Sequence, residues 1–163
     1  MIDATTLGTL AEFPQRLETH FAAIPARFAH WTPLSWSGIP SEPFTALEQV
    51  CHIRDIEIDG YHTRFARVLE ESNPDLPDID GAALAHERSY ATSDAVQAFA
   101  QFRRARTYTA SMIASWRDAD LRRPAIFEGR PASLRSLVHQ LCSHDQQHLA
   151  GLQWLLAQLA TQH

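Results

Sequence analysis

Residues 134–159 read LRSLVHQLCSHDQQHLAGLQWLLAQL, and this stretch decides the fold. Its leucines recur every three or four positions, which is the spacing of one face of an α-helix. At 100° per residue, His144 and His148 fall inside the same apolar stripe as Leu141 and Leu152. A long helix with such a stripe buries it against other helices, so the stretch predicts a helical bundle with two histidines facing its interior.

The two histidines need a partner, because an unpaired buried polar group costs about 1–3 kcal/mol of a total stability of about 5–15 kcal/mol. Side chains four residues apart on a helix lie on one face, with Cβ atoms about 5–6 Å apart. Two imidazoles at that spacing can reach one metal ion at about 2.0–2.1 Å each. The pair therefore favours a metal, although a carboxylate, a carbonyl or water could also serve as the partner.

Three further segments have helical periodicity, and together with the first they predict an all-α fold, a four-helix bundle. Pro25 is predicted to kink the first helix, and Ser93 and Ser133 are predicted to cap the third and the fourth. No strand pattern of useful length and no glycine-rich phosphate loop is visible. The predicted helices span residues 12–30, 44–71, 93–116 and 133–160.

The connections between these helices differ in length. Residues 73–92, between the second and third helices, are too many for a tight hairpin and predict a long crossover with a short helix near 82–88. Residues 118–132 form the other sizeable connection, and 128–131 are predicted to turn.

Composition describes one ordinary globular domain over residues 1–163, with 45% hydrophobic and 20% charged residues. The net charge of −5 argues against nucleic acid or an anionic membrane as a partner. All fourteen basic residues are arginine, which excludes a Schiff-base lysine and a phosphate-loop lysine. No signal peptide or membrane-length apolar segment is visible. The chain has only two cysteines, Cys51 and Cys142, which is too few for a disulfide framework, so we expect a cytoplasmic protein. Both cysteines are expected to be small core residues.

His52, on the second predicted helix, is the remaining candidate ligand. It lies about 140° from the centre of the main apolar stripe of that helix, so spacing alone leaves it one ordinary histidine among nine. His139 lies similarly far from the stripe of the last helix and is predicted to be exposed. A di-iron carboxylate centre is excluded because the chain has no paired Glu-x-x-His sequences.

Three separated segments nevertheless form a pattern. They are HIRDIE (52–57), with its histidine, aspartate and glutamate, the crossover with ERSY (87–90), and HDQQHL (144–149). In this order they resemble the DinB-like (DinB/YfiT-like) superfamily of four-helix-bundle metalloenzymes, and the resemblance covers nearly the whole chain.

The resemblance implies a metal site with three histidine ligands at His52, His144 and His148. Such a site keeps one or more positions open for water or substrate, and neutral imidazoles suit Zn, Ni or Fe(II) alike. Asp55 or Glu48 could accept a hydrogen bond from the second ring nitrogen of His52, with a solvated surface carboxylate as the alternative for each.

The resemblance also implies a metal-dependent enzyme, a thiol-dependent transferase or isomerase in which a low-molecular-weight thiol cosubstrate attacks a small electrophilic substrate. Arg64, Arg88 and Arg106 are candidates to hold a cosubstrate carboxylate. The alternatives are a non-catalytic metal-binding or stress-response protein, and a bundle that binds no metal. A homodimer is expected, as in many members of the family.

Overall fold

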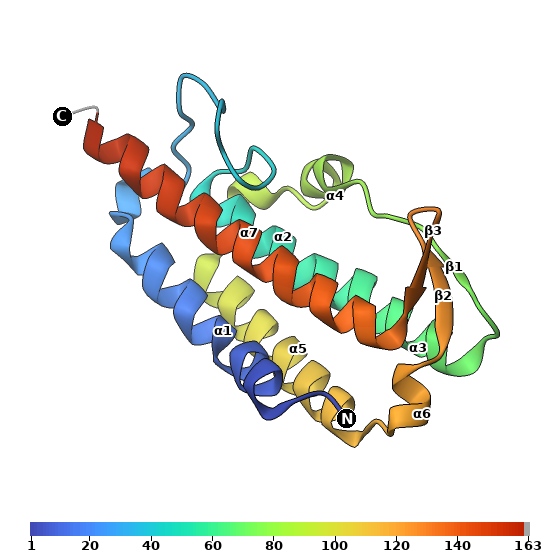
Figure 1. Ribbon diagram of the computed structural model, residues 1–163. Coiled ribbons are helices and arrows are strands. Elements are labelled where there is room, and N and C mark those ends of the chain that lie inside the picture. The colour runs from blue at the N-terminus through green and yellow to red at the C-terminus, as the bar shows by residue number, and fades with distance from the viewer. Residues whose placement is uncertain (162–163) are drawn as a thin grey trace.

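Four long helices form the body of the protein, in a computed structural model that describes residues 1–161. The second of them is continuous through a π-helical turn. Each long helix packs against two others: α1 and α2 both lie against α5 and α7, which confirms the predicted four-helix bundle (Figure 1). The helices are α1 (Ala4–Ala23), α2 (Ala46–Asp55) with the π turn (Ile56–Tyr61) and α3 (His62–Glu70), α5 (Ala95–Ser115) and α7 (Leu134–Thr161).

The first helix differs from its prediction at both ends. It begins before residue 12, because the Asp3 side chain accepts the Thr6 N–H at 2.9 Å and caps it. The predicted kink at Pro25 is wrong. The helix ends at Ala23, and Pro25 instead precedes a separate short 3-10 turn, Ala26–Phe28.

The other helix starts follow capping side chains. Thr45 and Glu48 form a reciprocal capping box at the start of α2. Ser133 accepts the Ser136 N–H at 3.2 Å, as predicted for the start of α7. The prediction of Ser93 as the cap of α5 is wrong by one residue, because Asp94 accepts the Gln97 N–H at 2.7 Å.

The π turn between α2 and α3 changes which side chains face inward. Its wider winding leaves Ile58 38% exposed, although the periodicity of a regular helix places this residue in the apolar stripe. Glu57, one residue earlier, is 1% exposed. The turn therefore brings a carboxylate rather than an isoleucine into the interior.

The long crossover runs along the outside of the bundle and contains the predicted short helix, α4 (Gly81–Glu87). Its start, β1 (Asp75–Leu76), pairs in parallel with β2 (Pro124–Phe127), which pairs antiparallel with β3 (Arg130–Ser133). This small sheet covers one end of the bundle (Figure 1). The sequence did not reveal it, because strands of two to four residues are too short to show alternation.

The interior consists of two apolar clusters with a polar layer between them. On α5, for example, Phe102 belongs to one cluster and Ile113 to the other, and the buried Arg106 lies between them. Near the same level lie the buried polar side chains of Gln49, His52, Glu57, Asp145 and His148. None of the helices within residues 1–161 is both long and apolar enough to cross a bilayer.

Candidate metal centre

Three imidazole rings from two helices converge in the polar layer. His52 comes from α2, and His144 and His148 come from successive turns of α7. The Nε2 atom of His144 lies 3.2 Å from Nε2 of His52 and 3.1 Å from Nε2 of His148. The structure thus brings together the three histidines that the family resemblance selects.

A fourth group, the Glu42 carboxylate, faces the same point. Its Oε1 lies 3.6 Å from Nε2 of His52, and its Oε2 lies 3.2 Å from Nε2 of His148. One donor atom from each of these four residues lies within 4.8 Å of the other three. Glu42 belongs to the loop before α2, and sequence reasoning missed it.

The donor set fits a divalent ion. Ligands held tetrahedrally at about 2.0–2.1 Å from one ion lie about 3.3–3.4 Å from one another, close to the two observed nitrogen–nitrogen distances of 3.1 and 3.2 Å. Imidazole nitrogens with a carboxylate oxygen suit Zn, Ni or Fe(II). No thiol lies in the set, and burial raises the pKa values of Cys51 and Cys142.

Gln49 fixes the tautomer of His148. Its Nε2 donates to Ser41 Oγ at 2.9 Å and to the carbonyl oxygens of Glu42 and Phe44, both at 3.2 Å. Because the amide nitrogen faces these acceptors, Oε1 faces His148 and accepts a hydrogen bond from its Nδ1. That ring then has Nε2 as the nitrogen available to a metal. The same side chain also anchors the loop that carries Glu42.

The surroundings of His52 differ from those predicted. Its Nδ1 is buried and has no hydrogen-bond partner within residues 1–161. Asp55 instead accepts the Tyr90 hydroxyl at 2.8 Å and pairs with Arg54, and Glu48 accepts the Thr45 N–H in the capping box. The prediction that Asp55 or Glu48 orients His52 is therefore wrong.

The His52 ring is confined by packing rather than by a carboxylate. The Phe44 ring centroid lies 5.0 Å from the centroid of His52. On another side, the backbone of Gly81 at the start of α4 approaches so closely that a Cβ atom there would lie 2.6 Å from Cε1 of His52. The crossover therefore closes over this ring, and only glycine leaves the necessary space.

Charge favours cation binding at this site. Burial, reinforced by His148, lowers the pKa of His52 to about 4, and burial also holds the pKa of His144 well below its usual value. Both rings are neutral at neutral pH, as metal ligands have to be. The neighbouring His148 ring lowers the pKa of Glu42, so this carboxylate is ionised.

Behind the histidines, Arg106 joins two buried carboxylates. It donates to Glu57 at 2.6–2.9 Å and to Asp145 at 2.7 and 2.9 Å, and Thr109 donates to Glu57 at 2.6 Å. The network links α5 to the helix that carries His52 and to α7. Because all its contacts lie in the interior, Arg106 is excluded as a ligand for a cosubstrate carboxylate. Arg88 pairs with Asp55 and Asp59.

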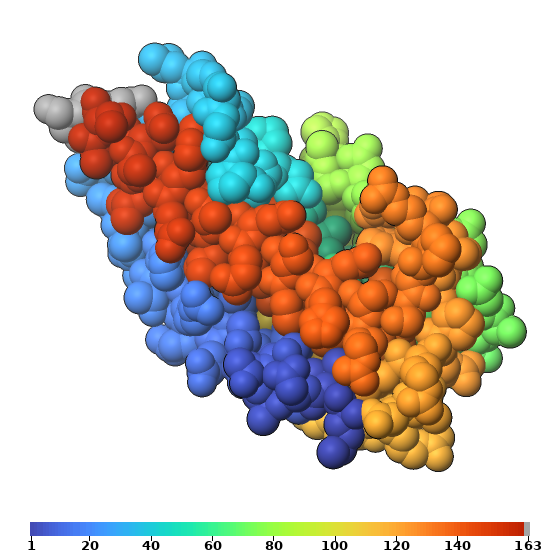
Figure 2. All heavy atoms as spheres, in the orientation of Figure 1, coloured from blue at the N-terminus to red at the C-terminus, as the bar shows by residue number. Residues whose placement is uncertain are grey.

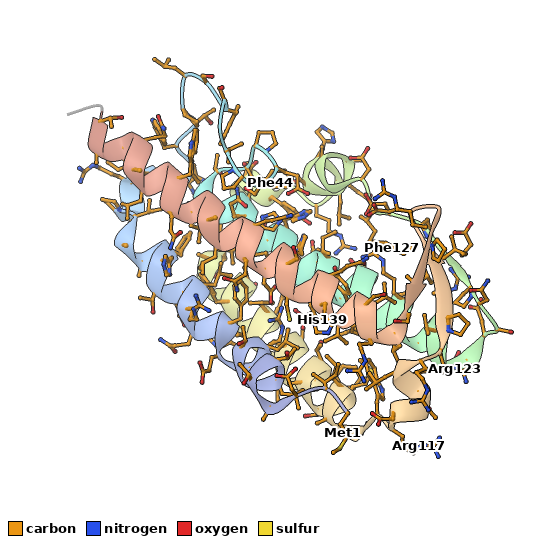
Figure 3. The ribbon with its side chains drawn as sticks, in the orientation of Figure 1. Met1, Phe44, Arg117, Arg123, Phe127 and His139 are labelled. Atoms are coloured by element: carbon orange, nitrogen blue, oxygen red, sulfur yellow. The ribbon has the colours of Figure 1, made fainter. Side chains whose placement is uncertain are left out.

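A cavity of about 360 Å³ opens beside the convergent rings. Figure 2 shows the hollow between α7, α4 and the β2–β3 hairpin. In Figure 3, Phe127 lies between the hairpin and α4, Phe44 lies over the start of α2, and His139 lies on the outer side of α7, exposed as predicted. The cavity is lined by Glu42, His52, Ile56, Tyr61, Arg64, Asp78, Ile79, Phe127, Glu128, Gln140, Ser143, His144 and Gln147.

Comparison with known proteins agrees with this architecture. The sequence profile of the DinB superfamily matches residues 9–152. The chain belongs to the DinB superfamily. Among solved structures, it is similar to YfiT from Bacillus subtilis, described as "a probable metal-dependent hydrolase with an unusual four-helix bundle topology". The TM-score is 0.83 at 18% sequence identity, and the match covers 98% of this chain and 91% of YfiT. No curated protein matches the chain.

For this member of the DinB superfamily, sequence reasoning missed two residues of the site. Glu42 lies on a loop, and its only sequence signal is a carboxylate shortly before a helix that carries a candidate histidine. Gln49 lies three residues before His52 and is completely buried, which is unusual for glutamine. Because the adjacent Glu48 is also polar, no signal in the sequence distinguishes Gln49 as a buried residue.

Proposed function

We propose that this protein is a metal-dependent hydrolase in which His52, His144 and His148 hold a divalent ion. The observation that carries the proposal is the convergence of three imidazole nitrogens and an ionised carboxylate at the wall of an open cavity. YfiT, whose fold this chain shares, is described as a probable metal-dependent hydrolase. The arrangement leaves access for a small substrate, as expected of a catalytic site.

A divalent ion held here would supply Lewis-acid activation of water and of a substrate oxygen. The carboxylate of Glu42, beside the histidine nitrogens, accepts the proton of the attacking water. A bond forms between the water oxygen and the electrophilic carbon, and the bond to the leaving group breaks. Glu42 then returns the proton to the leaving group, while Gln49 keeps His148 and the Glu42 loop in place.

The test uses the full chain purified without an affinity tag. Bound metal is quantified, removed with a chelator and replaced by Zn, Ni or Fe(II), and hydrolysis of p-nitrophenyl esters is followed at each stage. We expect activity to disappear with the metal and to return with about one equivalent. His148→Ala should abolish both metal binding and activity, whereas the exposed His139→Ala on the same helix should preserve both.

Several results would contradict the proposal. Metal content below about a tenth of an equivalent, with no rise in melting temperature on adding Zn or Ni, would show that the site binds no metal. Full activity in folded His148→Ala protein would exclude the metal mechanism. If turnover required an added low-molecular-weight thiol, hydrolysis would be the wrong reaction. The thiol-dependent transfer that the family resemblance implies would then be the activity. Bound metal without turnover of any ester would indicate a non-catalytic metal-binding protein.

The expected homodimer stays a prediction, as does the expected location in the cytoplasm. Light scattering coupled to size-exclusion chromatography would measure the mass of the particle and decide between one and two copies.

A further inference from the structure

Arg64 on α3 lines the same cavity as the histidines, and only 5% of it is exposed. Its Nη2 donates to the Pro77 carbonyl at 3.3 Å and to Asp78 Oδ1 at 3.5 Å, both long contacts. Within residues 1–161, Nε and Nη1 make no hydrogen bond. Arg106, by contrast, contacts two carboxylates at 2.6–2.9 Å. Nε and Nη1 are not among the buried unpaired polar atoms of residues 1–161, so these donors of an otherwise buried side chain are open to the cavity, where a ligand can reach them.

Packing holds this guanidinium at the cavity wall. Its central carbon lies 4.5 Å from the ring centroid of Phe127 and 5.2 Å from that of Tyr61. Gly60 in the π turn provides the space, because a Cβ atom there would lie 3.3 Å from Nη1 of Arg64. The aromatic rings restrain the arginine without satisfying its N–H groups, which is how a ligand-binding arginine is preorganised.

The position of Arg64 relates it to the candidate metal centre. The ring of Tyr61, which packs against Arg64, has its centroid 6.4 Å from that of His144. One aromatic side chain thus separates the guanidinium from the histidines, a span that a small organic molecule covers. Gln140 also lines this cavity, although its unpaired Oε1 atom is buried rather than open to it.

The other charges at the cavity do not neutralise Arg64. Glu42 lies against the imidazole rings. Asp78 and Glu128 are exposed, and the Asp78 side chain is 67% exposed at its long contact with Arg64. Exposed pairs of this kind are weak, so Asp78 reduces the positive charge that a ligand meets at Arg64 without cancelling it. A ligand carboxylate that bridges Nε and Nη1 in the plane of the guanidinium makes shorter, charge-assisted hydrogen bonds.

We propose that Arg64 binds a carboxylate group of the substrate, so that the substrate is a small molecule with a carboxylate at one end and the hydrolysable bond at the other. The inference rests on the proposed hydrolase function, since it places the bond to be cleaved at the histidines. The donors of Arg64 fix the orientation of the substrate.

The first test compares two esters with the same leaving group in the metal-loaded full chain. p-Nitrophenyl hemisuccinate carries a carboxylate, and p-nitrophenyl butyrate is its neutral counterpart. The ratio of their kcat/KM values should fall at least about tenfold in Arg64→Met, the loss expected for a charge-assisted contact. Arg67→Met is the matched control, because Arg67 lies one turn further along α3 and pairs with Glu71 at the surface. It should leave the ratio unchanged.

The second test measures binding and needs no turnover. By calorimetry, phenylacetate should bind the metal-loaded protein at least about tenfold more weakly after Arg64→Met, whereas neutral phenylacetamide should bind both forms alike. Asp78→Asn removes the competing carboxylate and should tighten phenylacetate binding. This variant keeps the inference testable if Arg64→Met fails to fold.

The outcomes separate the two proposals. Arg64-dependent binding of phenylacetate in a protein that hydrolyses no ester would overturn the hydrolase function and leave the carboxylate site standing. Metal-dependent hydrolysis, with the same ester ratio and the same phenylacetate affinity in wild type and Arg64→Met, would overturn the carboxylate site and leave the hydrolase standing. Unchanged phenylacetate affinity in Asp78→Asn would likewise count against Arg64 as the anion ligand.

Discussion

Arg106 and Asp145 are joined by two hydrogen bonds, from Nη1 at 2.7 Å and from Nη2 at 2.9 Å, in the interior between α5 and α7. Asp145 directly follows His144, so its side chain leaves the helix about 100° further round. While the histidine faces the cavity, the aspartate faces the arginine. This pairing fixes the rotation of α7 and with it the direction of the imidazole rings.

Replacing Arg106 by methionine should destabilise the protein strongly. The substitution leaves Glu57 and Asp145 buried without their cation, a loss of about 3–5 kcal/mol in the free energy of unfolding. Urea unfolding of the metal-free protein measures it. The exposed Arg104→Met on the same helix should change stability by less than about 0.5 kcal/mol. A loss below about 1 kcal/mol in Arg106→Met would mean that the carboxylates find other partners or become protonated.

Removing the Gln49 amide should weaken metal binding while preserving all of the proposed ligands. In Gln49→Leu, nothing accepts the hydrogen bond from Nδ1 of His148, and the loop that carries Glu42 loses its anchor. The affinity for Zn should fall about 10–100-fold, as for other outer contacts of metal ligands. Competition with a chromophoric chelator measures it. Gln146→Leu, exposed on α7, is the control. Equal affinities in the two variants would contradict the role of Gln49.

Adding a methyl group at Gly81 should weaken metal binding by displacing His52, whereas the Gln49 variant acts on His148. The Cβ atom of Gly81→Ala would meet Cε1 of His52 at 2.6 Å, so either the ring or α4 has to move. Zn affinity should fall at least about tenfold. Gly8→Ala is the matched control, since nothing lies within 4 Å of its added Cβ. Alanine in that helix should stabilise the protein by up to about 1 kcal/mol. Wild-type Zn affinity in Gly81→Ala would contradict the prediction and show that α4 can move away without displacing His52.

The stability of the metal-free protein should depend on pH through His52. The unfolded chain takes up a proton on this ring below pH 6.5, whereas the folded protein does so only near pH 4. Unfolding therefore binds a proton between these values, and the free energy of unfolding falls as pH drops through this window. The contribution is about 3 kcal/mol, complete above pH 6.5. Urea unfolding at pH 7 and pH 4.5 should show a larger decrease in wild type than in His52→Gln. Equal decreases would contradict the prediction.

The sequence was most informative where one face of a helix is buried and the other is exposed. On α7 the apolar stripe is regular, and His144 and His148 were placed correctly from spacing alone. On α2 the same reasoning failed for His52, because seven of the eight residues from Ala46 to Ile53 are buried and no single stripe exists. Only the resemblance to a known family selected His52 as a partner of the α7 pair.

The rest of the site depends on contacts that leave no periodic signal. Glu42 reaches the histidines from a loop whose path is fixed by hydrogen bonds to Gln49. The π turn depends on a shifted hydrogen-bond register, which cannot be predicted from the amino-acid composition of the segment. Periodicity therefore predicted the helices of the bundle, whereas the position of the Glu42 carboxylate and the outer contacts of the histidines required three-dimensional packing.

The π turn also governs alignment along the second helix. Arg64 follows His52 by twelve positions, which in an unbroken α-helix would point the two side chains about 120° apart. A π turn absorbs about one extra residue and reduces this angle to about 20°. A substitution that rewinds the turn would uncouple the guanidinium from the imidazoles, whereas a homologue shorter by one residue at this point would keep them in phase. The hydrogen-bond register of this turn therefore sets the alignment of the guanidinium with the imidazoles without any change in the histidines themselves.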